Sequence, residues 1–188
     1  MSLPFRCSAA SRERLEPLEG TASTVRAFLL VEAPGPWGVD AVRECRMDEE
    51  VRGRLLELER RHRVRPLLIR RHGRGGGDGT RVFAVHVDRD RPWAETVRLA
   101  DPRELLDLDL TGLREGRSPG LTEHEEPVFC VCTHGRHDAC CAEQGRPLAS
   151  AMSALAPGQT WEVSHIGGDR FAANVLVLPH GLYYGRLV

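Results

Sequence analysis

The chain has 188 residues, 41% of them hydrophobic, and a formal net charge of −1. That length allows one large domain or two small ones with a hydrophobic core. A net charge so close to zero gives no sign of nucleic acid or a membrane surface as partner. No apolar run approaches the roughly 20 residues that cross a bilayer. The first residues have no secretory apolar core, so we expect a cytoplasmic protein.

Cysteines are the most informative part of the composition. The chain has six, of which four fall within twelve residues: Cys130, Cys132, Cys140 and Cys141. In a reducing cytosol, clustered cysteines bind metals or act in catalysis more often than they form disulfides. We expect Cys130 to be a core residue of a strand. Cys7 and Cys45 have no partner at metal spacing and are expected to be a free thiol and a small buried residue.

The first half of the chain predicts an α/β order. Residues 1–24 show no strong periodicity and are interpreted as an N-terminal extension. A continuous apolar run predicts a buried strand over 27–32, followed by a proline- and glycine-rich loop over 33–38. After a cap at Asp48, Val51, Leu55 and Leu58 lie at helical spacing. The remaining predictions are strands over 64–69, 82–87 and 93–99, a glycine-rich turn over 73–79, and a short helix from Asp101 to about 110.

The same order starts again after a loop over 114–126. We predict a strand over 127–132, a loop over 133–138, and a helix whose apolar positions are Leu148, Met152 and Leu155. A strand over 161–164 and a tight turn over 166–168 follow. The predicted hairpin has the arms 170–178 and 182–187.

The two halves therefore resemble each other. Residues 76–87 are similar to residues 167–177, and the two first strands begin about one hundred residues apart. That spacing suits a duplicated domain better than a solenoid repeat, although any two α/β units look alike at this level. We interpret the chain as an α/β protein of two units, 25–113 and 127–188, the second ending early after its hairpin.

Two short segments of the second unit carry metal-binding side chains. Cys132 and Cys141 have eight residues between them, in a loop that leaves a strand and enters a helix. His165 and Asp169 have three between them, across a turn that contains Gly167 and Gly168. If neighbouring strands precede both loops, the loops meet at one edge of the sheet. Two ligands from each loop would give the four that a [2Fe–2S] cluster requires.

The two glycines have a predicted role beside such a cluster. A glycine lets the backbone come close to cluster sulfides that a Cβ would crowd. Backbone N–H groups at this turn would then donate hydrogen bonds to sulfur and tune the reduction potential. Gly167 and Gly168 are therefore candidate cofactor-binding residues.

The cysteine loop, together with residues 29–38, 164–179 and 184–186, resembles the sucrase/ferredoxin-like family over most of the chain. The members with clusters are thioredoxin-like ferredoxins, so the resemblance implies two thioredoxin-like units, the first without cluster ligands. These members hold a [2Fe–2S] cluster with two cysteines at this spacing and two histidines of a His-x-Gly-Gly-His turn. The resemblance thus implies Cys132, Cys141 and His165 as ligands. Family members often continue past the final hairpin, so Val188 looks like an early end.

The sequence departs from the family at the fourth ligand, where Asp169 replaces the second histidine. Iron accepts a carboxylate, which would make the cluster more negative and lower its potential. Alternatively, Asp169 is a turn residue that bonds nearby backbone N–H groups. Cys140 is then the best substitute, followed by His134 and His137, which are solvated loop residues by default.

The leading functional hypothesis is a non-enzymatic electron carrier that exchanges single electrons with a redox protein partner. Its donor, acceptor and oligomeric state stay open. The alternatives are a zinc site at the same four residues, a cluster-free module, and a thiol redox protein that uses Cys140 or Cys141. The absence of a Cys-x-x-Cys motif argues against a dithiol enzyme. No carboxylate pair suits glycoside hydrolysis.

Overall fold

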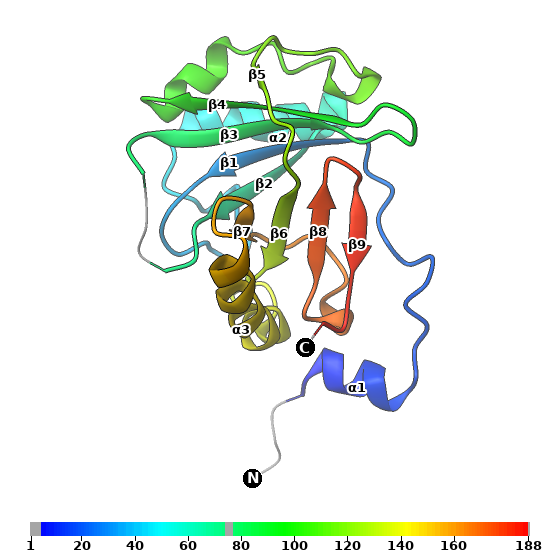
Figure 1. Cartoon of the computed structure of the whole chain (residues 1–188). Coiled ribbons are helices and arrows are strands. Elements are labelled where there is room, and N and C mark those ends of the chain that lie inside the picture. The colour runs from blue at the N-terminus through cyan, green and yellow to red at the C-terminus, as the bar shows by residue number, and fades with distance from the viewer. Residues whose placement is uncertain (1–4, 74–76, 188) are drawn as a thin grey trace.

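The computed structural model describes residues 5–73 and 77–187, and within them the chain forms one mixed sheet of nine strands. The strand order is β5-β4-β3-β1-β2-β7-β6-β8-β9, and the sheet curls strongly (Figure 1). Residues 74–76 lie outside the described residues. They belong to the predicted glycine-rich turn, and residue 76 begins the first of the two similar segments. Residues 1–4 of the extension and the early end at Val188 also lie outside the described residues.

The first half forms the predicted strands and helix. Its elements are β1 (Ala27–Glu32), α2 (Glu49–His62), β2 (Arg65–Arg70), β3 (Thr80–His86), β4 (Trp93–Leu99) and the 3-10 helix η1 (Pro102–Asp107). β1 pairs in parallel with β2 and antiparallel with β3, which pairs with β4. Helix α2 buries Val51, Leu55 and Leu58, as their spacing predicts. The helix crosses from β1 to β2 and so makes the parallel pairing possible.

The second half repeats this strand order. Its elements are β6 (Val128–Cys132), α3 (Ala139–Leu155), β7 (Thr160–Val163), η3 (Asp169–Phe171), β8 (Val175–Leu178) and β9 (Leu182–Tyr184). The preceding η2 (Leu113–Glu115) and β5 (Thr122–Glu123) pack on the first half, where β5 pairs with β4. β6 pairs in parallel with β7 and antiparallel with β8, which pairs with β9. The order β9-β8-β6-β7 therefore matches β4-β3-β1-β2 of the first half.

Two predictions about local structure were wrong, and one helix was not predicted. The N-terminal extension contains a helix, α1 (Cys7–Glu13). In α3 the fully buried face runs through Cys141, Gly145 and Ala149, whereas the side chain expected to extend the apolar stripe, Leu155, is 87% exposed. Both arms of the last hairpin are shorter than predicted, because η3 takes the first residues of one arm and the other ends at Tyr184.

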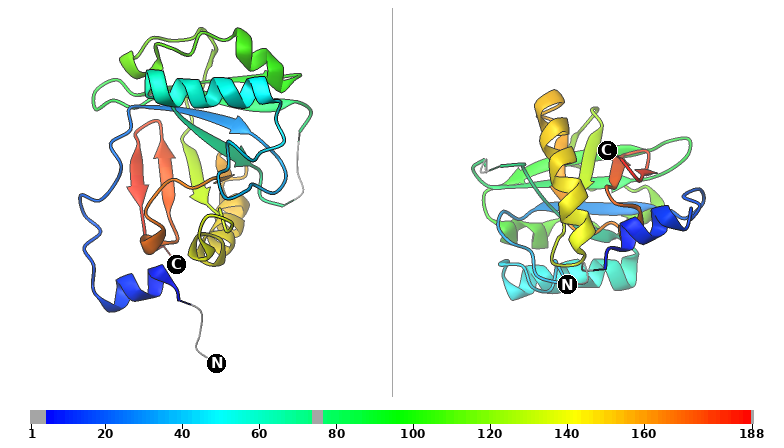
Figure 2. Two further views of the ribbon diagram at one scale, coloured as in Figure 1. Left: turned by 180° about the vertical axis from the view of Figure 1, so that it is seen from behind. Right: turned by 90° about the horizontal axis from the view of Figure 1, so that it is seen from below.

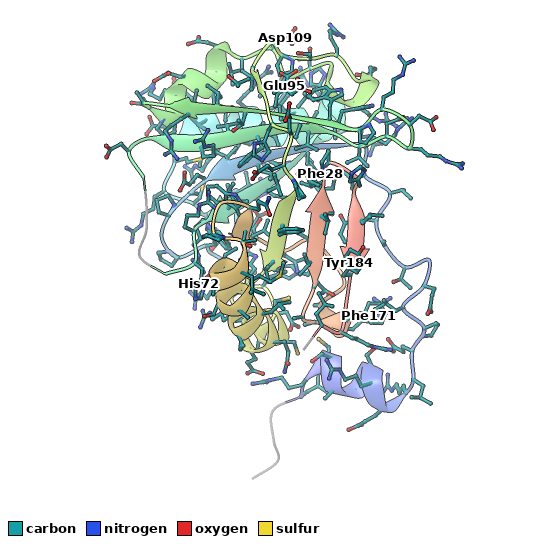
Figure 3. The ribbon with its side chains drawn as sticks, in the orientation of Figure 1. Phe28, His72, Glu95, Asp109, Phe171 and Tyr184 are labelled. Atoms are coloured by element: carbon teal, nitrogen blue, oxygen red, sulfur yellow. The ribbon has the colours of Figure 1, made fainter. Side chains whose placement is uncertain are left out.

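The curl of the sheet lets its two halves pack against each other. Their shared core includes Phe28 from β1, which is labelled in Figure 3. Trp161 from β7 and Cys130 and Cys132 from β6 belong to the same core. Cys130 is fully buried in this core, as predicted. Helix α2 covers the other face of the first half, and α3 packs on β6 and β7 of the second (Figure 2). None of the described helices is long and apolar enough to cross a membrane.

The halves join where the C-terminal ends of β2 and β7 pair antiparallel. Only two residue pairs form this ladder, Ile69 with Val163 and Arg70 with Glu162. The Arg70 guanidinium also donates to the Glu162 carboxylate at 2.7 and 2.9 Å. Glu162 is buried and accepts from the Thr133 hydroxyl at 2.8 Å, so the junction is bonded to the loop that follows β6.

Helix α3 approaches the end of β6 unusually closely at Gly145. A Cβ added there would lie 2.0 Å from the carbonyl oxygen of Cys132. Only glycine therefore lets the first turns of α3 lie against the strand end. This close approach helps to set the distance between Cys132 and Cys141.

We predict that Gly145→Ala destabilises the protein by about 1–3 kcal/mol, because α3 must move away from backbone that cannot yield. Gly53→Ala is the matched control, since Gly53 is exposed in α2 and a Cβ there meets nothing within 4 Å. The control should stabilise the helix by about 0.5–1 kcal/mol. Urea unfolding of both variants measures the difference, and equal effects would contradict the packing argument.

Candidate metal centre

Three elements bring the candidate ligands together. β6 ends at Cys132, α3 carries Cys141 in its first turn, and β7 ends at Val163, two residues before His165. Because β6 and β7 are parallel neighbours, their following loops leave the same edge of the sheet. The expected meeting of the two loops is therefore found.

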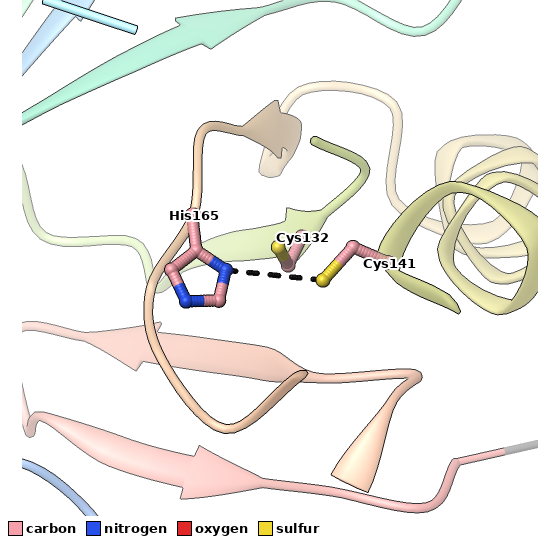
Figure 4. Close-up of side chains that lie close together, drawn as sticks. All are labelled: Cys132, Cys141 and His165. Carbon is pink, nitrogen blue, oxygen red and sulfur yellow. Dashed lines mark hydrogen bonds between the residues drawn. The ribbon is translucent and has the colours of Figure 1, made fainter. Parts of the chain in front are cut away.

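The two sulfurs and one ring nitrogen form a compact group. The ligand atoms of Cys132, Cys141 and His165 all lie within 4.8 Å of one another, and Nδ1 of His165 is 3.8 Å from Sγ of Cys141 (Figure 4). Both cysteines are fully buried, and the His165 side chain is 18% exposed. The group is thus shielded on its sulfur side and reaches solvent through the imidazole.

The electrostatics of the group favour one thiolate. A hydrogen bond from the Cys141 thiol, helped by His165, holds the pKa of Cys132 well below its usual range although burial opposes this. The same interaction with Cys132, together with burial, raises the pKa of Cys141. The thiolate form, which binds metals, is therefore favoured at Cys132.

The imidazole of His165 has close neighbours on two sides. The ring of His137 stacks on it with centroids 3.7 Å apart and planes inclined by 22°. Oδ1 of Asp169 lies 3.9 Å from Nε2, the ring nitrogen that does not face Cys141. That separation is too long for a hydrogen bond. Asp169 thus sits next to the centre but outside the compact group of three donors.

His134, a substitute ligand in the sequence analysis, has both ring nitrogens engaged. Nδ1 accepts a hydrogen bond from the backbone N–H of His165 at 3.2 Å, and Nε2 donates to the carbonyl oxygen of Gly38 at 2.6 Å. Burial lowers the pKa of His134, in keeping with a neutral ring. The ring also meets Trp37 edge-on, with centroids 5.8 Å apart. His134 therefore connects the two halves rather than facing the sulfurs.

The backbone conformation of the turn requires glycine at both of its positions. Gly167 and Gly168 have φ angles of +99° and +71°, which residues with a Cβ rarely adopt. A Cβ at either position would meet no protein atom closer than 3.7 Å, so crowding by the protein is not the reason for glycine. Asn174 fixes the turn by donating to the carbonyl of Gly168 at 2.6 Å.

Cys140, the preferred substitute for the fourth ligand, belongs to a different group. Its Sγ lies 3.5 Å from Sγ of Cys7, which in turn lies 3.7 Å from a carboxylate oxygen of Asp169. Sequence reasoning missed this position for Cys7, because 133 residues separate it from Cys140. No local spacing signal connects the two. Cys45 is buried in the core of the first half, as expected.

A model of the sucrase/ferredoxin-like family matches residues 18–188. The chain belongs to the sucrase/ferredoxin-like family. The resemblance noted from the sequence is thus confirmed, and the matched range includes Cys132, Cys141 and His165. Comparison with curated proteins and with solved structures gives no significant match. Two thiols and an imidazole suit iron and zinc better than the hard cations magnesium and calcium.

The buried carboxylate of Glu162, where β2 and β7 pair, should make the free energy of unfolding depend on pH. Burial alone would raise the pKa of Glu162, but hydrogen bonds from Arg70, His72 and Thr133 outweigh it and hold the pKa below the usual 4.5. A depressed carboxyl pKa contributes stability above pH 4.5, which is lost as the pH falls through the folded-state value. Wild-type protein should therefore lose free energy of unfolding below pH 4.5 more steeply than Glu162→Gln.

At neutral pH the Glu162→Gln variant should be less stable by about 1–3 kcal/mol, because Arg70 loses its charged partner. Urea unfolding across the acidic range measures both effects. Glu125→Gln, at an exposed position between β5 and β6, is the control and should follow the wild type. Parallel pH profiles for wild type and Glu162→Gln would contradict the assignment.

Proposed function

We propose that the protein is an electron carrier whose centre is a [2Fe–2S] cluster held by Cys132, Cys141 and His165, with Asp169 as fourth ligand. The observation that carries the proposal is the convergence of two buried sulfurs and one imidazole nitrogen within 4.8 Å. Membership of the sucrase/ferredoxin-like family adds support.

The residues fit such a group in the chemistry of their donors. Cluster irons take cysteine thiolates and, in some centres, histidine, and the lowered pKa of Cys132 favours the thiolate. Asp169, 3.9 Å from His165, is near enough to be the fourth candidate. When bound, a [2Fe–2S] cluster accepts and releases one electron.

The protein's own residues would control access to this centre. The buried cysteines keep water from the sulfur side, while His165 borders a surface cleft of about 440 Å³. Charged side chains of the first half, Asp40, Arg43, Glu59 and Arg65, also line the cleft. Mixed charges of this kind steer a protein partner electrostatically. We propose this cleft as the side from which a redox protein partner exchanges electrons with the centre.

The repeated strand order supports the finer fold assignment. We infer two thioredoxin-like units that arose by duplication, with ligands in the second unit only. The support is the shared order, with the first strand between the second and third, and the β-α-β crossover in each half. All six cysteines are free thiols, which fits the reducing cytoplasm where we place the protein.

A single zinc ion is the second candidate. Ligand atoms around one tetrahedral zinc are about 3–4 Å apart, and the group of three donors is nearly that compact. A thiol redox protein receives less support, because Cys140 and Cys141 are both buried. Metal analysis separates the two metal hypotheses.

We expect protein purified without oxygen to be red-brown, with about two irons and two sulfides per chain. Cys132→Ser, Cys141→Ser and His165→Ala should each lose most of the iron and the visible absorption. Cys130→Ala is the matched control on the same strand, outside the donor group, and should keep both. Colourless protein with one zinc would favour the second candidate, and metal-free protein would contradict both.

The fourth ligand has its own test in the reduction potential. If the carboxylate of Asp169 binds iron, Asp169→His replaces an anion by a neutral ligand and should raise the potential by on the order of 100 mV. Asp169→Ala should alter the visible and EPR spectra. Unchanged spectra and potential in Asp169→Ala would remove Asp169 from the ligand set.

A further inference from the structure

A second group of donors lies next to the first and shares none of its residues. The ligand atoms of Cys7, Asp138 and Cys140 all lie within 4.8 Å of one another. Sγ of Cys7 is 3.4 Å from Oδ2 of Asp138 and 3.5 Å from Sγ of Cys140. Cys7 precedes the residues that match the family, so the match does not account for this group.

An ion pair and hydrogen bonds hold the N-terminal segment so that Cys7 lies at this position. Just before Cys7, Arg6 forms a two-pronged ion pair with Glu143 of α3, at 2.5 and 2.7 Å. Further along, Arg186 donates to the carbonyl oxygen of Glu16 at 2.7 Å and to the Ser11 hydroxyl at 3.2 Å. Contacts on both sides of the short helix α1 thus place the thiol against the start of α3.

Asp138 is also fixed in a way that leaves one oxygen available. Its Oδ1 caps α3 by accepting from the backbone N–H of Cys140 at 2.7 Å. Its Oδ2 faces Cys7. An oxygen of Asp169 also lies 3.7 Å from the sulfur of Cys7. Two thiols and one carboxylate therefore form the group, and a second carboxylate lies beside Cys7.

The adjacent guanidinium of Arg6 is bonded elsewhere: Nε and Nη2 donate to Glu143, and Nη1 donates to the carbonyl oxygen of Phe5. Thiolate and carboxylate ligands together suit a zinc-like cation, which binds cysteine sulfur and aspartate oxygen. A disulfide between Cys7 and Cys140 would not use Oδ2 of Asp138, which faces Cys7. The donor set therefore favours a cation over a disulfide.

We propose that Cys7, Asp138 and Cys140 bind a thiophilic divalent cation of the zinc class, at a site separate from Cys132, Cys141 and His165. Binding displaces a proton from each thiol and forms two metal–sulfur bonds and one metal–oxygen bond, without any change of oxidation state. The cation would fasten the N-terminal segment to α3, directly beside Cys141. This site does not depend on the identity of the first centre.

Cobalt(II) binding to the full-length metal-free protein, under reducing and oxygen-free conditions, tests the site. Thiolate-to-cobalt absorption follows the titration, and bound metal is counted after gel filtration. We expect Cys7→Ser to bind one cobalt fewer than the wild type, and Cys130→Ser to bind the same number. Asp138→Asn keeps the helix cap but removes the negative charge. It should weaken the binding of the same cobalt ion that Cys7→Ser loses.

A second measurement uses the Cys132→Ser variant, in which the first centre lacks one of its ligands. Cobalt(II) should still protect Cys7 and Cys140 from alkylation, as read by mass spectrometry of the tryptic peptides. Failure of the electron-carrier proposal leaves this result unchanged.

Three results would overturn the second site. One is equal cobalt binding by wild type and Cys7→Ser, and another is alkylation of Cys7 at the same rate with and without cobalt. The third is loss of all bound metal in Cys7→Ser with an unchanged circular dichroism spectrum, which would show a single shared centre.

Discussion

Cys132 and Val163 stand opposite each other at the ends of β6 and β7, and the position of the centre depends on this parallel register. Because the two strands run in the same direction, the loop with sulfur ligands and the loop with the imidazole leave the same edge. Helix α3 then returns along β6 at the close contact made by Gly145, which sets the second sulfur beside the first. A slip of one residue in either strand would turn the donors to opposite faces of the sheet.

The first half supplies contacts that the centre needs, although none of the three central donors comes from it. Its loop after β1 places the carbonyl of Gly38 and the ring of Trp37 against His134. His134 in turn accepts from the backbone N–H of His165, so the position of the imidazole depends on both halves. The buried bond between Arg70 and Glu162 holds the halves together beneath the cysteine loop. This coupling gives the unit without ligands a physical role.

Much of the fold and the central part of the site could be predicted from the sequence. Apolar runs located the main strands, and the stripe of Val51, Leu55 and Leu58 located α2, because burial dictates both patterns. Helix α1 and the position of Cys7 could not be predicted. A helix of seven residues has little periodicity, and distant ion pairs such as Arg6 with Glu143 decide where it lies. In α3 the predicted stripe was wrong only at Leu155, because Leu148 and Met152 pack against the core; the contact at Gly145 could not be predicted.

The central claim is that one imidazole and two sulfurs bind the same iron centre. Pulsed EPR of the reduced protein tests it directly, because a bound imidazole gives a nitrogen hyperfine coupling too large for a ring outside the ligand set. We expect this coupling in the wild type and in Cys130→Ala, and loss of most of the iron–sulfur signal together with the coupling in His165→Ala. A reduced iron–sulfur signal without strong nitrogen coupling, or one that survives unchanged in His165→Ala, would contradict the account.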